Sequence, residues 1–279
     1  MIDAHVHVAR PNLPGAGSLS PLLDAGAENV AAALRDEMRA AGVRHVLAMG
    51  SCLTTPDDPL GVDGTLAVAR QVPGVYAVGV ADPTRGADPE HMRRVEAVVA
   101  SGRVRALKAY LGYLHFAPTD PGYRPYYELA ERRRLPVFFH TGDTYSPRAR
   151  LRFARPLPID DVAVDHPRAC FILAHLGNPW LTDAAEVVYK NVNVWADLSG
   201  FVIGGPEAFA GADRQEMLSE TRAALGRAYR YAERPNRFLY GSDWPLAPMT
   251  AYRDLIASSI PESHHPLLFE ENARLLFRL

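Results

Sequence analysis

The sequence contains little cysteine and no long apolar run, and each absence excludes a class of protein. Its two cysteines, Cys52 and Cys170, lie far apart and outside any CxxC spacing, which argues against a disulfide framework and a thiolate metal site. No window approaches the roughly 18 continuous apolar residues of a membrane span, and the chain does not start like a signal peptide. We therefore expect a cytoplasmic protein with no membrane partner.

The sequence also lacks a large excess of charge of one sign, because its formal net charge is −2 at pH 7. The only basic triplet is Arg132, Arg133 and Arg134, which at the end of a predicted helix is typical of a solvated face favoured by the helix dipole. Nothing in this pattern favours nucleic acid binding. We expect a small-molecule partner, and the sequence leaves open whether the chain forms a homo-oligomer.

The sequence does contain a regular alternation of short apolar runs with longer amphipathic stretches. Eight apolar runs lie at 2–6, 43–49, 75–80, 104–109, 136–140, 170–175, 192–198 and 237–242. The stretches between them predict helices, among them 24–41, 88–101 and 123–134, with proline and glycine at their ends. Because repeated βα units form a parallel sheet and eight of them close a barrel, the pattern predicts a single α/β domain over residues 1–279, a (β/α)8 TIM barrel.

Polar residues end several of these runs, at spacings of whole βα units. Six of them fall on predicted strands one, four, five, six and eight: His5, His7, Lys108, His140, His175 and Asp243. Side chains alternate across a strand, so this spacing places the six on one face of their strands. All sit at carboxyl ends, where barrel enzymes gather catalytic groups. The sequence therefore predicts a ring of imidazoles and a carboxylate at one end of the barrel.

This ring has the chemistry of a metal site. Imidazole and carboxylate suit zinc, and also manganese, iron or nickel. We expect a divalent metal, with Zn²⁺ preferred, held by members of this ring. Lys108 could join only after losing its charge, which carbamylation would achieve, and two metals could then share the carbamate. The remaining site candidate, His175, belongs to the same ring, whereas other histidines break the register and are predicted to be structural or exposed: His45, His91, His166, His264 and His265.

Six motifs follow one another along the chain: HVH at 5–7, LKAY at 107–110, FFHTGD at 138–143, ILAHLGN at 172–178, LYGSDWP at 239–245 and ENARLLF at 271–277. In this order they resemble the amidohydrolase superfamily, in its branch of small amidohydrolase-related proteins. The resemblance implies that His5, His7, His140 and Asp243 bind the metal. It also implies that His175 either ligates a second metal or contacts substrate and activated water.

Two further expectations follow from the resemblance. Lys108 matches the lysine that is carbamylated in two-metal members, whereas many relatives in this branch use one metal, so we expect one metal and leave a second open. Many amidohydrolases carry a flanking β-sandwich built from both termini. Here the HxH begins at His5, so the barrel is expected without that domain.

The same resemblance implies an enzyme, and two reactions stay open. The favoured one is hydrolysis of a small amide, lactone or ester by a metal-activated water, with Asp243 as the proton acceptor and His175 orienting or polarising the scissile carbonyl. The alternative is non-oxidative decarboxylation of an aromatic or dienoic acid, with Asp243 protonating carbon. We expect loops 11–24, 52–62, 141–157 and 199–214 to select the substrate. The candidate substrate-binding residues are Tyr110, Tyr113, His115, Arg148, Arg150, Asn178 and Trp244.

Overall fold

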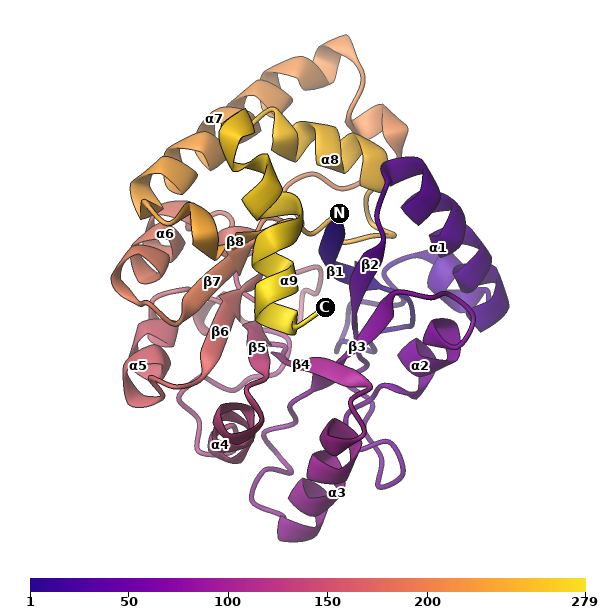
Figure 1. The fold of residues 1–279 in the computed structure, drawn as a ribbon, viewed down its shortest axis with the longest axis vertical. Coiled ribbons are helices and arrows are strands. Elements are labelled where there is room, and N and C mark those ends of the chain that lie inside the picture. Colours follow the sequence, from indigo (N-terminus) through magenta and orange to yellow (C-terminus); the bar gives the residue numbers. More distant parts are fainter.

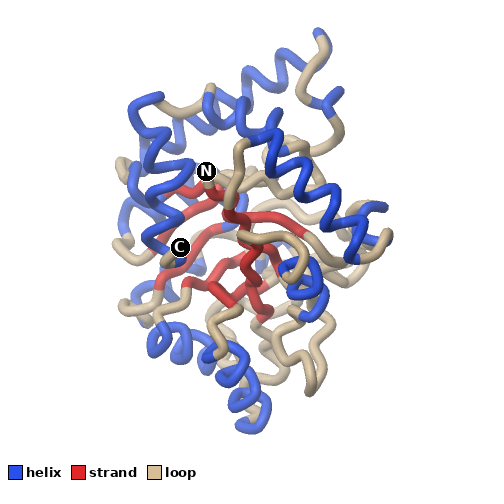
Figure 2. Tube along the Cα trace, turned by 45° about the vertical axis from the view of Figure 1, so that its right-hand side comes forward, coloured by secondary structure: helices blue, strands red, loops and turns tan.

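The computed structural model describes residues 1–211 and 213–279 and contains one sheet of eight parallel strands in chain order. The strands are β1 (Ile2–His7), β2 (His45–Met49), β3 (Val75–Val80), β4 (Val104–Ala109), β5 (Pro136–Phe139), β6 (Cys170–Leu173), β7 (Val194–Asp197) and β8 (Phe238–Leu239). The helices are α1 (Ala27–Ala41), α2 (Asp63–Ala69), α3 (Pro89–Ala100), α4 (Arg124–Arg133), α5 (Pro158–Asp165), α6 (Leu181–Lys190), α7 (Gln215–Ala232), α8 (Met249–Ala257) and α9 (Asn272–Phe277). Figure 2 shows the strands at the centre with helices outside them. The predicted (β/α)8 TIM barrel is confirmed.

Backbone hydrogen bonds between β1 and the segment that follows β8 close the barrel. Asp243 N donates to His5 O at 2.9 Å, and His7 N donates to Trp244 O at 2.6 Å. These bonds join the two ends of the chain of βα units, which are more than 230 residues apart in the sequence. Closure therefore places the two histidines of β1 directly beside Asp243.

A buried carboxylate supports this seam. Asp3, which is fully buried, accepts hydrogen bonds at Oδ1 from Ser242 N at 3.0 Å and from His5 N at 3.1 Å. Burial raises the pKa of Asp3 to about 7, against the opposing effect of these hydrogen bonds. The carboxyl group thus satisfies two backbone donors at the point where the sheet changes from β8 to β1.

Apolar side chains fill the inside of the barrel. They include Ile2, Ala4, Leu47, Met49, Val78, Ala106, Phe138, Ile172, Trp195 and Leu239. Helix α9 lies across the barrel beside both chain termini (Figure 1), and its Phe277 stacks on Phe138 with ring centroids 5.9 Å apart. On its other side Phe138 contacts the His5 ring edge-on, at 6.1 Å. A packed core therefore separates α9 from the carboxyl ends of the strands.

Helix boundaries follow the predicted start and stop residues, with one shift. Helix α1 begins at Ala27 rather than at residue 24, because residues 21–24 form a separate 3-10 turn and Gly26 adopts a φ of 86°. It ends before Gly42, whose φ of 72° is a left-handed conformation that favours glycine. Asp88 caps α3 by accepting from Glu90 N at 3.0 Å.

Strands β6 and β8 are shorter than predicted, and the reason is local backbone geometry. The apolar runs were expected to stay extended to residues 175 and 242, but β6 ends at Leu173 and β8 at Leu239. After β6, residues 174–177 form a 3-10 turn in which His175 has a φ of 61°, which is incompatible with an extended strand. After β8, the backbone N–H of Tyr240 donates to Leu268 O at 3.1 Å rather than to a neighbouring strand. The predicted loop 199–214 includes Ala212, which lies outside the described residues. Within the described part of the chain, no helix is long and apolar enough to cross a membrane.

The packing of α1 on the barrel gives a stability prediction. Leu34 on α1 is 0% exposed and belongs to a cluster that includes Val6 and Val46. We expect Leu34→Ala to lower the free energy of unfolding by about 2–5 kcal/mol, because it removes buried methyl groups and leaves a cavity. Urea denaturation measures the change. Leu275→Ala, at a position that is 76% exposed, is the control and should change it by less than about 0.5 kcal/mol; equal losses would contradict the described packing.

Candidate active site

The predicted ring of histidines is present at the carboxyl ends of the strands. Ring centroids lie 5.6 Å apart for His5 and His7, 4.8 Å for His5 and His175, and 5.0 Å for His140 and His175. His5, His7 and His140 are buried, and His175 is half-buried. Residues from β1 and from the segments after β5 and β6 thus converge as the spacing predicted.

Three of these groups are arranged as a metal-binding set. Asp243 Oδ1 lies 3.4 Å from His7 Nε2 and 3.6 Å from His5 Nε2, and one ligand atom from each of the three lies within 4.8 Å of the others. Zinc bonds of about 2.0–2.1 Å in tetrahedral geometry separate neighbouring ligands by roughly 3.3–3.5 Å. Asp243 Oδ1 is buried and has no hydrogen-bond partner among the described residues. The three residues therefore fit a divalent cation.

His140 is near this set but is not part of it. Its Nε2 lies 2.9 Å from the backbone oxygen of Asp143, and a carbonyl oxygen can only accept a hydrogen bond. Nε2 therefore carries the proton, and Nδ1 is the nitrogen that remains available as a ligand. Ligation by His140 stays a prediction.

Asp197, which sequence reasoning missed, orients His5 from behind. Its Oδ2 lies 2.9 Å from His5 Nδ1, and both side chains are buried. A ligating imidazole usually donates its second nitrogen to such a carboxylate, which orients the ring. Because Asp197 engages Nδ1, His5 has Nε2 free to face His7 and Asp243. The available signal was an aspartate ending the seventh apolar run, the position held by ligands on other strands.

Lys108 lies inside the barrel at the end of β4. Its Nζ is buried, lies 5.3 Å from the centroid of the Tyr110 ring and 5.8 Å from that of Phe138, and has no hydrogen-bond partner among the described residues. Burial lowers the pKa of Lys108 to about 8, although Asp197 and Asp243 oppose the change. Carbamylation, and with it the number of metals, stays a prediction.

Burial and neighbouring charge set the protonation of the site. Burial lowers the pKa of His7 and that of His140, and it lowers the pKa of His175 to about 4. Burial alone would raise the pKa of Asp243, but the nearby imidazoles outweigh it and hold the pKa below its usual range. Near neutral pH His7, His140 and His175 are therefore neutral and Asp243 is ionised, the forms that bind metal.

Glycines allow the polar groups to approach the backbone. A Cβ on Gly200, whose φ is 73°, would lie 2.6 Å from His175 Nδ1. A Cβ on Gly241 would lie 2.8 Å from the Cβ of His5. Both positions therefore require glycine for the histidines to reach their places.

A cavity of about 270 Å³ opens beside the ring. Its lining comes from the segments after β5, β6, β7 and β8: His140, Asp143, Tyr145, His175, Asn178, Gly200, Phe201, Ile203 and Asp243. Among the described residues that line it there are two carboxylates and neither lysine nor arginine. The loops predicted to select substrate thus contribute through 141–157 and 199–214.

The structure places only some predicted substrate-binding residues at this cavity. Asn178 lines it, and the Tyr113 ring packs 4.9 Å from the His140 ring while its hydroxyl accepts from Tyr145 N at 2.9 Å. Tyr110 is buried and donates to Gly50 O at 2.9 Å. The other three lie away from the lining in exposed positions after β4 and β5: His115, Arg148 and Arg150.

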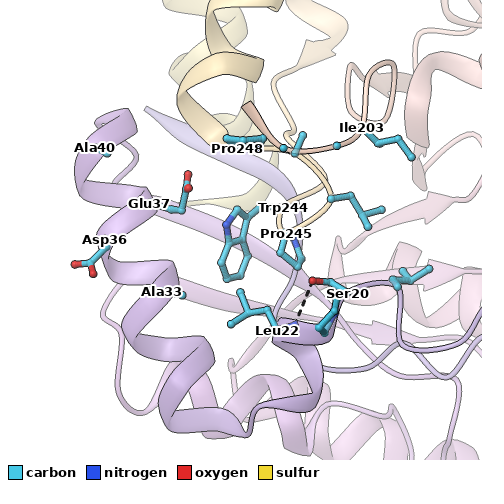
Figure 3. A pocket seen from close by; sticks show the side chains of 16 residues that line it. Ser20, Leu22, Ala33, Asp36, Glu37, Ala40, Ile203, Trp244, Pro245 and Pro248 are labelled. Atoms are coloured by element: carbon cyan, nitrogen blue, oxygen red, sulfur yellow. Dashed lines mark hydrogen bonds between the residues drawn. The ribbon is translucent and has the colours of Figure 1, made fainter. Parts of the chain in front are cut away.

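Trp244 faces a different cavity, of about 710 Å³. Figure 3 shows its ring between α1, which carries Ala33 and Glu37, and the segment with Pro245 and Pro248. Ile203 lines both this cavity and the one beside the histidines, so the two cavities are neighbours. The tryptophan does not line the smaller cavity.

Comparison with known proteins decides the family. Residues 2–279 match the second amidohydrolase family, described as amidohydrolase. The chain belongs to this family. It is therefore an enzyme of the amidohydrolase family, whose members are metal-dependent, and the resemblance seen in the six motifs is confirmed.

Solved structures share the fold of this amidohydrolase. One is an uncharacterised TIM-barrel protein from Bordetella bronchiseptica, with 18% identity, a TM-score of 0.69 and coverage of 100% of this chain and 98% of that one. A probable 2-pyrone-4,6-dicarboxylic acid hydrolase from Acinetobacter baumannii has 13% identity, a TM-score of 0.70 and coverage of 100% and 99%. A 5-carboxyvanillate decarboxylase from Sphingomonas paucimobilis has 16% identity, a TM-score of 0.66 and coverage of 100% of this chain and 99% of that one. No curated protein matches the sequence.

The ligand geometry predicts which substitution weakens metal binding by this amidohydrolase. We expect His7→Ala to weaken Zn²⁺ or Mn²⁺ binding by at least about 100-fold, since a lost ligand costs more than a lost supporting group. Equilibrium dialysis with elemental analysis measures it. His91→Ala is the matched control, because His91 is buried but bonds to Tyr126 on the outer helices. Equal affinity in both variants would remove His7 from the metal site.

The lowered histidine pKa values predict a pH dependence of the metal-free protein. In the unfolded chain these imidazoles take up protons near pH 6.5, whereas in the folded protein His175 does so near pH 4. The unfolded state therefore binds more protons between these values, and the free energy of unfolding falls as the pH drops through this window. Urea denaturation at pH 7 and pH 5 measures the loss, which should be smaller in His175→Gln. A loss equal to that of the unmodified protein would contradict the described burial.

Proposed function

We propose that this protein is a metal-dependent hydrolase that cleaves the C–N or C–O bond of a small amide, lactone or ester. The observation that carries the proposal is the charge of the 270 Å³ cavity, whose lining includes Asp143 and Asp243 but, among its described residues, no lysine or arginine. A substrate carboxylate placed there would meet negative charge without a cationic side chain to offset it. A neutral acyl compound placed there would not be repelled by these carboxylates.

The chain's own groups suit this chemistry. A bound divalent cation would supply Lewis acidity, which polarises a carbonyl and acidifies water. His5, His7 and Asp243 are the residues that would hold it. Asp243 is ionised and lines the cavity, so it can accept a proton from the attacking water and return it to the leaving amine or alcohol.

The other lining residues position the reactants. His175 lies beside Asp243 along the cavity wall, with Asn178 next to it. Phe201 and Ile203 supply apolar surface, which would exclude bulk water around the acyl group. A volume of about 270 Å³ suits a small compound rather than a polymer.

Decarboxylation of an aromatic or dienoic acid is the second candidate. It is favoured by the 5-carboxyvanillate decarboxylase among the proteins of similar fold, and a cation at the histidines could bind the carboxylate. In that reaction Asp243, which is ionised in the resting site, would first have to accept a proton from water and then pass it to the carbon from which carbon dioxide leaves. The charge of the cavity favours the first candidate, because in a decarboxylase the cation alone would have to offset the repulsion of the substrate carboxylate by Asp143 and Asp243.

Turnover by the metal-loaded protein tests both candidates. We expect hydrolysis of members of a panel of neutral lactones, esters and amides, and no release of carbon dioxide from aromatic acids. Asp243→Asn, assayed with enough metal to saturate its weakened site, should lower kcat by about 10²–10⁴ through loss of the proton acceptor. The charge argument is checked with Asp143→Asn, which should raise kcat/KM for a carboxylated analogue relative to its neutral parent. Carbon dioxide release without any hydrolysis would contradict the proposal.

A further inference from the structure

We propose that Asp197 and Ser199 are positioning residues that hold both His5 and His175 as the tautomer with a proton on Nδ1 and a lone pair on Nε2. The two residues lie at the end of β7, a strand to which sequence reasoning assigned no functional group. The inference concerns the resting protein and holds for either of the two candidate reactions.

Asp197 is surrounded by hydrogen-bond donors. Its Oδ1 accepts from the backbone N–H of His175 at 3.0 Å and from that of Ser199 at 3.0 Å. Its Oδ2 lies 2.9 Å from His5 Nδ1. A carboxylate that accepts several hydrogen bonds and has an imidazole beside it is ionised and can only accept. His5 must therefore donate from Nδ1, which leaves the lone pair on Nε2.

The single proton of the Ser199 hydroxyl is committed to the same carboxylate. Ser199 Oγ lies 2.5 Å from Asp197 Oδ1, a separation that requires a proton between the two oxygens because their lone pairs would otherwise repel. Once that proton is used, Ser199 Oγ has only lone pairs to offer to its other neighbours. The hydroxyl thus acts as an acceptor toward both imidazoles.

His175 is the neighbour that this acceptor orients. Its Nδ1 lies 2.9 Å from Ser199 Oγ, so Nδ1 must carry the proton and Nε2 the lone pair. The His5 Nδ1 is 3.2 Å from the same oxygen and shares it more weakly. The space for this arrangement depends on Gly200, where a Cβ would lie 2.6 Å from His175 Nδ1. The Asp197 carboxylate therefore fixes the tautomer of two imidazoles, that of His5 directly and that of His175 through the Ser199 hydroxyl.

This tautomer limits what His175 can do. A neutral imidazole with its lone pair on Nε2 can accept a hydrogen bond from water or bind a cation, but it cannot donate a hydrogen bond to a substrate carbonyl from that nitrogen. Of the roles expected for His175, contact with activated water and ligation of a second cation are compatible with this tautomer, whereas polarisation of the scissile carbonyl is not. Polarisation of the carbonyl then falls to other groups.

The test is the tautomeric state of the metal-free protein, read by long-range ¹H–¹⁵N NMR of the imidazoles at pH 7.5. Signals of the two histidines are assigned by their loss in His5→Gln and His175→Gln. We expect both rings to be protonated at Nδ1. Ser199→Ala should move the His175 signals toward the Nε2-protonated form and leave those of His5 in place. Asp197→Asn should alter both rings and weaken Zn²⁺ binding about 10–100-fold.

Ser146→Ala is the matched control, because Ser146 is a buried serine whose Oγ donates to Pro14 O rather than to a histidine. It should change neither the spectra nor the metal affinity. An Nε2-protonated His175 in the unmodified protein would overturn the proposal, as would unchanged His175 signals in Ser199→Ala. If Asp197→Asn does not fold, Ser199→Ala still decides. Because these spectra involve no substrate, they stand apart from any failure of the proposed hydrolysis.

Discussion

Closure of the barrel between β1 and the segment after β8 is the constraint on which the site depends. The hydrogen bonds of Asp243 N to His5 O and of His7 N to Trp244 O fix the two segments at backbone level. Their side chains then lie at ligand-to-ligand distances without further adjustment. Asp3 supports the seam by accepting from the backbone N–H groups of His5 and Ser242. Loss of closure would separate His5 and His7 from Asp243, and the candidate metal site would be lost.

The site concentrates polar groups in a part of the barrel from which water is largely excluded. Burying an ionised carboxylate is costly unless donors or a cation offset it. Asp197 meets this requirement through hydrogen bonds from His5, Ser199 and the backbone, whereas Asp243 Oδ1 lacks any such bond among the described residues. The contrast between the two aspartates supports the roles proposed for them, in which Asp197 orients ligands and Asp243 binds a cation and moves a proton. The left-handed backbone at Asp243 and His175 is consistent with strain held at a functional site.

The two cavities at this end of the barrel differ in what they can contribute to recognition. The smaller one combines Asp143 with the ring of histidines, and its charge is the main argument for a neutral substrate. The larger one lies outside Ile203, between α1 and the chain around Trp244 (Figure 3). Ile203 lines both cavities, so the loop after β7 contributes to each of them.

Much of this arrangement could be predicted from local pattern. The eight βα units and the positions of His5, His7, Lys108, His140, His175 and Asp243 follow from apolar runs and from the polar residues that end them, because a parallel barrel brings all carboxyl strand ends to one side. The end of α1 at Gly42 and the start of α3 at Asp88 could also be predicted, because helix caps depend on residues that are neighbours in the chain.

The rest depended on contacts between distant segments. Nothing in the sequence near Asp197 distinguishes an ordinary strand-end aspartate from one bonded to His5, which is 192 positions away. The backbone has a positive φ at His175 and at Asp243. The alternation of side chains along a strand could not predict this conformation. Arg148 and Arg150 are close to the site in sequence, but the loop after β5 leaves them exposed and outside the lining of its cavity. Local pattern thus specified which groups meet, and packing across the barrel specified which atoms face one another.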